Sequence, residues 1–252
     1  RAEFPNQPTI GTETASTRTT RGIYADDKAR GYVAAYGENG VEKAWTWWAY
    51  YAAHPFTSGE FVWTGFDYRG EPTPYKWPCI SSHFGLMYTC VWPNYSYEEY
   101  EAWWSDKPVL HLAANRVSPS DADKTNLVRC FSNCKTVELF RNGKSLGKKS
   151  MPTNEFLDWN VPYGPGVLSA RGYNGKKIVA ETKMETSVSP AAIQLHPDRS
   201  IISADGRDLS IIEVSDVDEN GELVAYANNL VRFEINGPGK IIGVGNGDPS
   251  SP

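Results

Sequence analysis

The segment Gly59-Glu60-Phe61-Val62-Trp63-Thr64-Gly65 is an apolar and aromatic run bounded by glycines, and this composition predicts a β-strand. Upstream of it, bulky residues recur at i, i+4, i+7 and i+11, which predicts a helix just before the strand. Residues 8–12 come earlier and predict a short strand that ends in a polar cluster. The order strand, helix, strand is typical of a parallel α/β unit. The helical face consists of Val41, Trp45, Trp48 and Ala52.

A second helix is expected after this unit. Ser96-Tyr97-Glu98-Glu99 has the spacing of a capping box, so we expect Ser96 to cap a helix that continues through Trp104. Pro108 follows closely and should end it, because proline cannot continue a helix. Of the nine Trp residues only Trp159 lies beyond this point, which favours a domain boundary between residues 106 and 107.

After residue 107 the pattern changes to short β-like runs separated by turn signals. Asn142-Gly143 and Asn174-Gly175 each lie between such runs, and Asn-Gly is the strongest short-range signal of a β-hairpin. We therefore predict an immunoglobulin-like β-sandwich over residues 107–189. Its strand candidates are residues 127–130, 137–140, 167–170 and 178–180.

Residues 190–252 contain fewer strand signals. We expect strands at 209–214 and 231–235, and a hairpin turn at Asn220-Gly221. The acidic residues before this turn resemble half of a calcium loop, but the twelfth position, which needs a bidentate Glu, is Ala227. So few strands cannot close a sandwich, and we expect a second, incomplete β-sandwich in a chain cut from a longer protein.

Composition and charge exclude several classes of function. The chain has 252 residues with 25 basic and 30 acidic side chains, and it contains no basic block, so a nucleic acid partner is not expected. No apolar run reaches the roughly 20 residues of a membrane helix. The four cysteines form no C-x-x-C pair, so we expect buried free thiols, and neither a metal ligand set nor a cofactor motif is found.

Two aromatic and acidic positions stand out as candidates for chemistry. Glu13 comes directly after the first predicted strand, and catalytic carboxylates lie at the carboxyl ends of barrel strands. Trp63 ends the next strand and is followed by Asp67 and Glu71, an arrangement that suits a sugar-binding pocket. The alternative for Glu13 is a solvent-exposed loop residue without a catalytic role, and the alternative for Trp63 is a residue that only packs in the core.

These residues carry a resemblance to a known family. Thr12-Glu13-Thr14-Ala15-Ser16, followed by Arg21-Gly22, resembles the nucleophile segment of glycoside hydrolase family 2 β-galactosidases. The run from Gly59 to Ser82 is similar to the last barrel strand of that family and its continuation. Residues 137–147 resemble the sandwich domain after the barrel, and residues 243–249 resemble a segment of the final sandwich domain.

The resemblance implies that residues 1–106 are the C-terminal part of a (β/α)8 TIM barrel, followed by immunoglobulin-like β-sandwich domains at 107–189 and 190–252. It implies a retaining, exo-acting β-glycosidase that hydrolyses terminal β-galactosides by double displacement. Glu13 would be the nucleophile, Trp63 would line the subsite for the non-reducing sugar, and Asp67 would accept hydrogen bonds from sugar hydroxyls. The substrate would be a β-linked oligosaccharide or polysaccharide, and the location secreted or periplasmic.

The chain also departs from the family pattern. The acid/base Glu of the family follows an Asn on an earlier barrel strand, whereas the only Asn-Glu pair here, Asn154-Glu155, lies in the sandwich region. We therefore expect the acid/base residue to be missing from this chain, and the chain alone to be poorly active or inactive. The partial barrel predicts self-association or a need for the remainder of the enzyme. His83 stands where the family pattern has Tyr.

Three alternatives stay open. One is a β-glucuronidase and another is a β-mannosidase of the same family. The third is a non-catalytic fragment that binds carbohydrate or supports a catalytic domain. A glucuronidase needs a cation for the substrate carboxylate, and four basic residues lie near the motif segments. These residues are Arg18, Arg21, Arg69 and Lys76.

Overall fold

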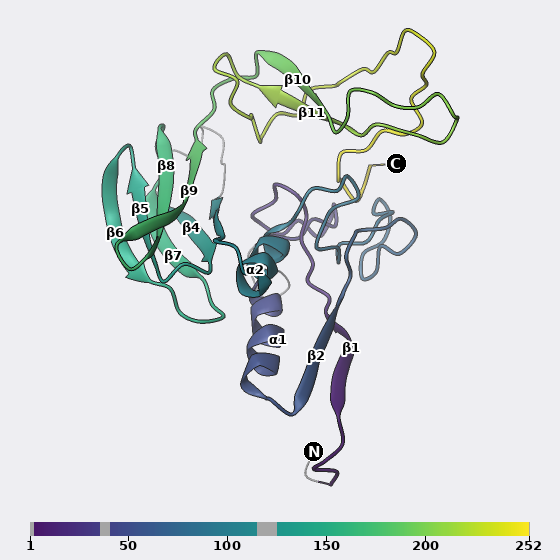
Figure 1. The fold of residues 1–252 in the computed structure, drawn as a ribbon. Helices are drawn as coiled ribbons and strands as arrows, with labels where there is room; N and C mark the ends of the chain where they lie inside the picture. Colours follow the sequence, from purple (N-terminus) through teal and green to yellow (C-terminus); the bar gives the residue numbers. More distant parts are fainter. Residues whose placement is uncertain (1–2, 36–40, 115–124, 252) are drawn as a thin grey trace.

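The computed structural model describes residues 3–35, 41–114 and 125–251. Figure 1 shows a parallel strand pair with helices beside it, a β-sandwich next to the helices, and a short antiparallel strand pair with long loops. Among the described residues, the longest helices are too short and too polar to cross a membrane.

The first unit is a parallel β–α–β arrangement. Strands β1 (Thr9–Ala15) and β2 (Thr57–Trp63) pair in parallel, and helix α1 (Val41–Ala53) connects them and contacts both. This confirms the predicted order. Strand β1 is longer than predicted, so Glu13 lies inside the strand and not in a loop after it. The described part of this sheet has two strands, and its assignment to a barrel stays a prediction.

Helix α2 (Tyr95–Trp104) begins two residues earlier than expected, because its N-cap is Asn94 and not Ser96. The Tyr97 N–H donates to Asn94 Oδ1 at 3.0 Å, so Asn94 is the N-cap, and the capping box at Ser96 is wrong. Ser96 lies in the first helical turn and is buried. Asn94 is also buried and donates its amide to the Gly85 carbonyl, so it is a structural residue of this helix start.

The two helices pack through tryptophans. The ring of Trp48 on α1 stacks on Trp103 at 6.2 Å between centroids and meets Trp104 edge-on at 5.4 Å. Of the predicted apolar stripe of α1, Trp48 therefore faces α2, while the ring of Trp45 meets Phe156 of the sandwich edge-on, with 6.2 Å between centroids.

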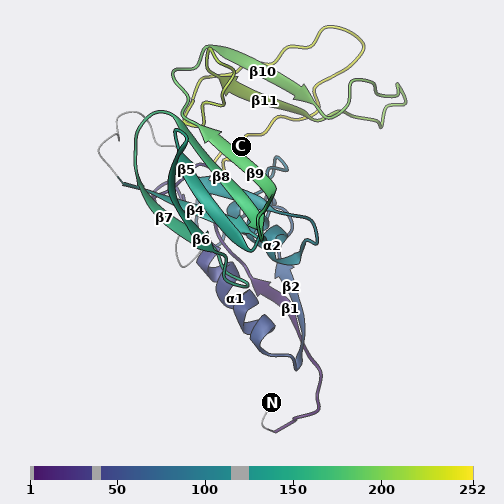
Figure 2. The same ribbon diagram turned by 60° about the vertical axis from the view of Figure 1, so that its left-hand side comes forward.

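The predicted β-sandwich is confirmed. A three-stranded antiparallel sheet faces a four-stranded antiparallel sheet (Figures 1 and 2). The strand order of the first is β3 (Leu110–Ala114), β4 (Thr125–Ser132) and β7 (Leu157–Pro162), and that of the second is β6 (Lys144–Ser150), β5 (Thr136–Arg141), β8 (Val167–Asn174) and β9 (Lys177–Glu185).

The core of the sandwich comes from alternate residues on the inner faces of both sheets, as the strand period of two dictates. Val128, Val137 and Leu139 are fully buried there. A second apolar cluster lies on the outer side of the β3–β4 sheet, where Phe131 packs with Ala102 of α2. The helices and the sandwich therefore share a packed boundary.

Both predicted hairpins are present. Asn142 and Gly143 connect β5 to β6 with φ angles of 49° and 77°, which are the left-handed values that a two-residue turn needs. Between β8 and β9, Asn174 pairs with Lys177, and Gly175 takes a φ of 67° in the turn.

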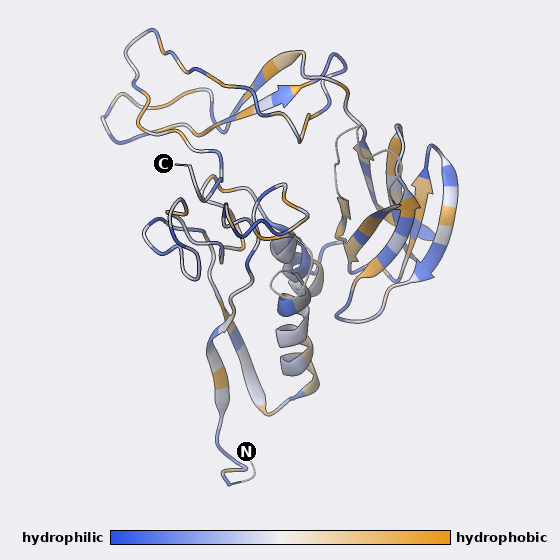
Figure 3. Cartoon of the chain, turned by 180° about the vertical axis from the view of Figure 1, so that it is seen from behind, coloured by the Kyte–Doolittle hydropathy of each residue, from blue (hydrophilic) through white to orange (hydrophobic). Residues whose placement is uncertain are grey.

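Residues 190–252 form less regular structure than the sequence predicts. Strands β10 (Ala192–Pro197) and β11 (Ile212–Val217) make an antiparallel pair, so the strand expected at 209–214 begins three residues later. The strand expected at 231–235 is wrong, because these residues are extended without a ladder partner. Many apolar side chains of this region are exposed, and they appear in Figure 3 as orange segments along its loops and strands.

Candidate functional site

The exposed face of the β1–β2 sheet carries the two strongest candidates. Thr14 pairs with Val62 in register and donates from Oγ1 to Glu60 Oε2 at 2.7 Å, on the side of the sheet where the helices lie. The pairing register of β1 shifts between Gly11 and Thr14, so simple alternation does not place Glu13, but Glu13 is exposed where Thr14 is buried and therefore lies on the opposite face. Trp63 follows Val62, the partner of Thr14, and projects from that opposite face as well. Glu13 is exposed and Trp63 is 38% exposed. The structure therefore brings the predicted nucleophile and the predicted aromatic wall to one face, near the carboxyl ends of neighbouring strands.

Tyr68 joins this pair and was not identified as a site residue from the sequence. Its ring meets Trp63 edge-on, with 6.1 Å between centroids, and its hydroxyl donates to Glu71 Oε2 at 2.6 Å. Burial raises the pKa of Tyr68, and so do its hydrogen bond to Glu71 and, to a smaller extent, the negative charges of Glu71 and Glu13. We call Glu13, Trp63, Tyr68 and Glu71 the Glu13 cluster.

Asp67 has a different environment from the one expected of a sugar ligand. Its Oδ1 accepts from Ser82 Oγ at 2.7 Å and from the Gly85 N–H at 2.9 Å. Burial raises its pKa to about 6 despite these hydrogen bonds. Oδ1 of Asp67 therefore ties the residues from 82 to 85 to the end of β2, and a contact with sugar hydroxyls stays a prediction.

Glu60 is the other carboxylate of β2, and it belongs to the helix side. It accepts from Thr14, and the Tyr100 hydroxyl of α2 donates to its Oε1 at 3.4 Å. Burial raises its pKa, while the two hydrogen bonds act in the opposite direction. A substrate on the Glu13 face cannot reach it, so Glu60 does not serve as the partner carboxyl of Glu13.

The Asn154-Glu155 pair lies between β6 and β7 of the sandwich. Asn154 Oδ1 accepts from the indole N–H of Trp48 on α1 at 3.0 Å. This contact joins the loop before β7 to α1, and that Glu155 is not the acid/base residue stays a prediction.

The basic residues near the motifs separate into two groups. Arg21 is exposed, but its guanidinium lies 3.4 Å over the ring of Trp92 and donates to the Asn246 carbonyl, and the partial desolvation there lowers its pKa. It is therefore turned toward the C-terminal segment. Arg69 and Lys76 are exposed and follow β2, while Arg18 is half-buried.

His83 belongs to a buried layer behind the site. One ring nitrogen, Nε2, lies 2.7 Å from the Gly31 carbonyl, and the ring packs against Tyr75 at 4.7 Å between centroids. Burial lowers the pKa of His83, which favours the neutral ring. The cysteines are free thiols as predicted: Cys79, Cys130 and Cys134 are buried and Cys90 is half-buried.

The calcium-like acidic segment is a backbone turn. Asp218 accepts from the N–H groups of Val188, Asn220 and Glu222, as an aspartate in a tight turn does. Within residues 3–35, 41–114 and 125–251, His, Cys, Asp and Glu form no group of three that could hold a metal ion.

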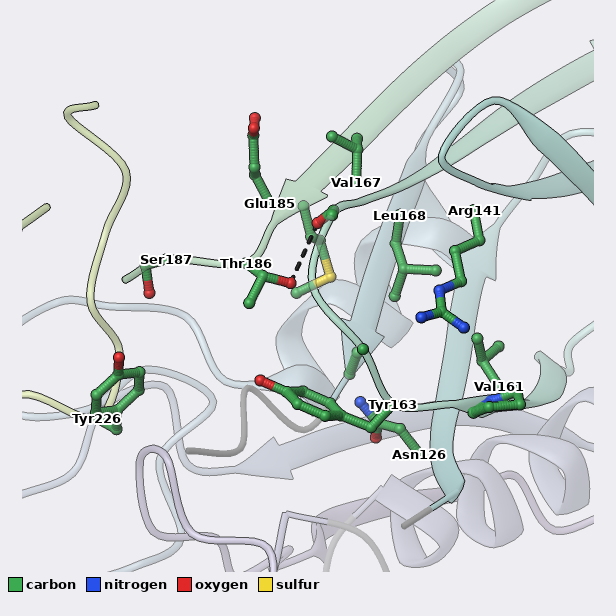
Figure 4. A pocket seen from close by; sticks show the side chains of 15 residues that line it. Asn126, Arg141, Val161, Tyr163, Val167, Leu168, Glu185, Thr186, Ser187 and Tyr226 are labelled. Atoms are coloured by element: carbon green, nitrogen blue, oxygen red, sulfur yellow. Dashed lines mark hydrogen bonds between the residues drawn. The ribbon is translucent and has the colours of Figure 1, made fainter. Parts of the chain in front are cut away.

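A separate pocket lies at one end of the sandwich, and Figure 4 shows it between the loop before β8 and the end of β9. Tyr163 and Tyr226 border it, and Thr186 Oγ1 donates to the Gly166 carbonyl at 3.1 Å. Glu185 is the one carboxylate among its described lining residues, so these residues lack the carboxyl pair that glycoside hydrolysis needs. The Glu13 cluster is therefore the better candidate for catalysis.

Two family models match the chain. Residues 193–252 match the glycoside hydrolase family 2 C-terminal domain 5. Residues 123–180, which include most of the sandwich, match a domain of unknown function (DUF4982).

Similar proteins of known family were also found. Beta-galactosidase BoGH2A of Bacteroides ovatus is 37% identical over 99% of this chain and 32% of its own length. A beta-glucuronidase of Formosa agariphila is 27% identical over 94% of this chain and 25% of its own length. The crystal structure of a beta-glycosidase from Bacteroides vulgatus superposes with a TM-score of 0.86 and 31% identity, covering 96% of this chain and 36% of that chain. The chain thus spans about a third or less of the length of these relatives.

Proposed function

Because this chain belongs to glycoside hydrolase family 2, we propose that it is part of a retaining, exo-acting β-glycosidase that hydrolyses terminal β-galactosides. In this proposal β1, α1, β2 and α2 are the last units of a (β/α)8 barrel. The helices cover one face of the parallel pair and leave the other face exposed, which is the arrangement that barrel strands and their outer helices have.

One observation carries the proposal: Glu13 and Trp63 share the exposed face of neighbouring parallel strands. A retaining glycosidase needs a carboxylate that can approach the anomeric carbon, and an apolar surface can pack against the face of the sugar ring. Glu13 and the Trp63 ring have the chemistry for these two tasks.

In the first half of the reaction, a carboxylate oxygen of Glu13 forms a bond to the anomeric carbon as the glycosidic C–O bond breaks. The leaving oxygen takes a proton from a second carboxyl group, supplied by the remainder of the enzyme. Water then attacks the anomeric carbon from the face that the leaving group vacated, opposite Glu13, gives a proton to that second group, and releases Glu13 as the bond to its carboxylate breaks. The second carboxyl group must lie about 5–5.5 Å from that of Glu13.

A glucuronide is the second candidate substrate, and the similarity to a beta-glucuronidase of Formosa agariphila favours it. Such a substrate needs a cation for its carboxylate. Arg21 contacts Trp92 and Asn246 instead, which leaves Arg69 and Lys76 as exposed candidates on this chain. We prefer the galactoside because the 37% identity to a beta-galactosidase extends over 99% of the chain.

Covalent trapping tests the nucleophile. We expect a 2-deoxy-2-fluoro-β-galactosyl fluoride to label the peptide that contains Glu13, because fluoride departs with little help from a general acid. In the complete enzyme, Glu13→Gln should lower turnover by several orders of magnitude, since removing a covalent nucleophile has effects of that size.

Glu71→Gln is the matched control, because it removes the neighbouring carboxylate of the cluster and leaves Glu13 in place. An adduct on Glu71, or near wild-type turnover of Glu13→Gln, would contradict the nucleophile assignment. Labelling by the corresponding glucuronyl fluoride, without labelling by the galactosyl reagent, would favour the second candidate.

A further inference from the structure

The segment Asn246–Ser251 returns to the first unit of the chain, although more than 150 residues separate it from β2. In Figure 1 the C-terminal trace ends beside the loops that follow β2. The carbonyl of Pro249 accepts from the N–H groups of Ile80 and Ser81 at 2.9 and 3.3 Å. Pro249 is buried, while most residues between 225 and 246 are exposed.

Side chains within the segment fix the direction of this carbonyl. Asn246 Oδ1 accepts from the Asp248 N–H at 2.9 Å. Asp248 Oδ1 accepts from both the N–H and the hydroxyl of Ser250, at 2.8 and 2.7 Å. The other oxygen, Oδ2, accepts from the Tyr32 hydroxyl at 3.0 Å. Asp248 therefore shapes the turn around Pro249 and anchors it to the loop that follows β1.

Arg21 and Gly247 make a second attachment. Arg21 is held over Trp92 and donates to the Asn246 carbonyl. A Cβ added at Gly247, where φ is +74°, would lie 3.5 Å from Cβ of Tyr88, so Gly247 lies beside Tyr88 with room for little more than a methyl group between them. The segment thus lies between the stretch after β1 and the stretch after β2.

Residues 80–82, which the segment contacts through Pro249, also form hydrogen bonds with the backbone around Tyr68 of the Glu13 cluster. The Ser82 N–H donates to the Tyr68 carbonyl at 2.8 Å, and Ser82 Oγ donates to Asp67. The Gly70 N–H donates to the Ile80 carbonyl at 2.9 Å. Residues 80–82 therefore fix the backbone of Tyr68, whose ring meets Trp63.

We infer that Asp248 is a positioning residue of the glycosidase reaction: through the Pro249 carbonyl and Tyr32 it holds residues 80–82, and thereby Tyr68 and Trp63, in place for the sugar bound at Glu13. This inference rests on the proposed function. It assigns to the region matched by the C-terminal family model an influence on substrate binding that is transmitted through residues 80–82.

Hydrogen exchange on this chain tests the first step. Asp248→Ala removes the acceptor for Ser250 and Tyr32, and we expect amide exchange in a peptide covering residues 77–88 to rise by about tenfold, the effect of losing one or two net hydrogen bonds. Asp205→Ala is the matched control, because Asp205 caps a comparable turn at Arg207 and Asp208 away from this contact.

Kinetics of the complete enzyme on a nitrophenyl β-galactoside test the second step. We expect Asp248→Ala to raise KM by about tenfold with a smaller effect on kcat, because it loosens binding of the sugar without touching the reacting carboxyl groups. Asp248→Asn keeps an acceptor for Ser250 and should restore most of the lost affinity. Tyr32→Phe should raise KM in the same direction, and the double variant Tyr32→Phe/Asp248→Ala should add little.

Unchanged exchange in Asp248→Ala would overturn the inference. So would faster exchange with unchanged KM and kcat, or an equal effect of Asp205→Ala. Failure of the proposed function is a separate result, because it appears as undiminished turnover in Glu13→Gln.

Discussion

Replacing Asp67 with asparagine should flatten the pH dependence of the stability of this chain between pH 4 and pH 7. Burial raises the pKa of Asp67 from its ordinary value of 3.8 to about 6. Asparagine keeps an oxygen that can accept from Ser82 and Gly85 and carries no charge. The substitution therefore removes the cost of burying a carboxylate while keeping the hydrogen bonds of the loop.

The sign and size follow from proton linkage. The folded chain binds the Asp67 proton more tightly than the unfolded chain, so the free energy of unfolding falls as pH rises from about 3.8 through about 6. At about 1.4 kcal/mol for each pH unit, this interval corresponds to a loss of about 3 kcal/mol at neutral pH. Below the lower pKa the wild-type side chain is protonated in both states, and the loss is absent.

Urea unfolding followed by tryptophan fluorescence at several pH values measures this difference. We expect the wild-type chain to lose about 2.5 kcal/mol more than Asp67→Asn between pH 4 and pH 7.5, since a small part of the loss is already present at pH 4. Asp106→Asn, at an exposed position after α2, controls for removing one negative charge. Equal pH dependence in the wild type and Asp67→Asn would refute the assignment of a buried, destabilised carboxylate.

Three substitutions test the structural elements by thermal or urea unfolding. Leu139 is fully buried between the two sheets, so Leu139→Ala leaves a cavity and should lower the free energy of unfolding by about 2–5 kcal/mol. If Ile178→Ala, at an exposed position, lowered it more, that result would contradict the assignment of Leu139 to the sandwich core. Asp158→Asn removes the carboxylate that pairs with buried Arg129 through two 2.8 Å hydrogen bonds and should cost about 2–4 kcal/mol, an effect that 1 M salt should barely change. Asn94→Ala should cost at least about 1 kcal/mol through loss of the α2 cap, whereas Ser96→Ala should cost less.

Several elements of this fold can be predicted from short stretches of sequence, because their conformation depends on neighbouring residues alone. The turn at Asn142-Gly143 requires two left-handed residues, and Asn-Gly is the pair that tolerates them best, so the hairpin is encoded within a few residues. Helix α1 follows from the spacing of its tryptophans, and β2 from its run of strand-forming residues. The family assignment is also a property of the sequence, because the segments around Glu13 and Trp63 are continuous motifs.

Other features depend on residues that are distant along the chain. Whether Asn94 or Ser96 caps α2 depends on packing, because Asn94 also donates to the Gly85 carbonyl and Ser96 is buried. The strand expected at 231–235 fails for the same reason, since a strand needs a ladder partner that its own residues cannot provide.

The sequence by itself determined the family, the strand, helix, strand, helix order of the first unit and the identity of Glu13 as the candidate nucleophile. Only the tertiary structure decided that Glu13 and Trp63 share one face, that Tyr68 completes their cluster, and that Asp248 reaches Tyr32. The physical reason is that sheet register, burial and hydrogen bonds across more than 200 residues are set by how the whole chain packs, and no local pattern of residue types records them.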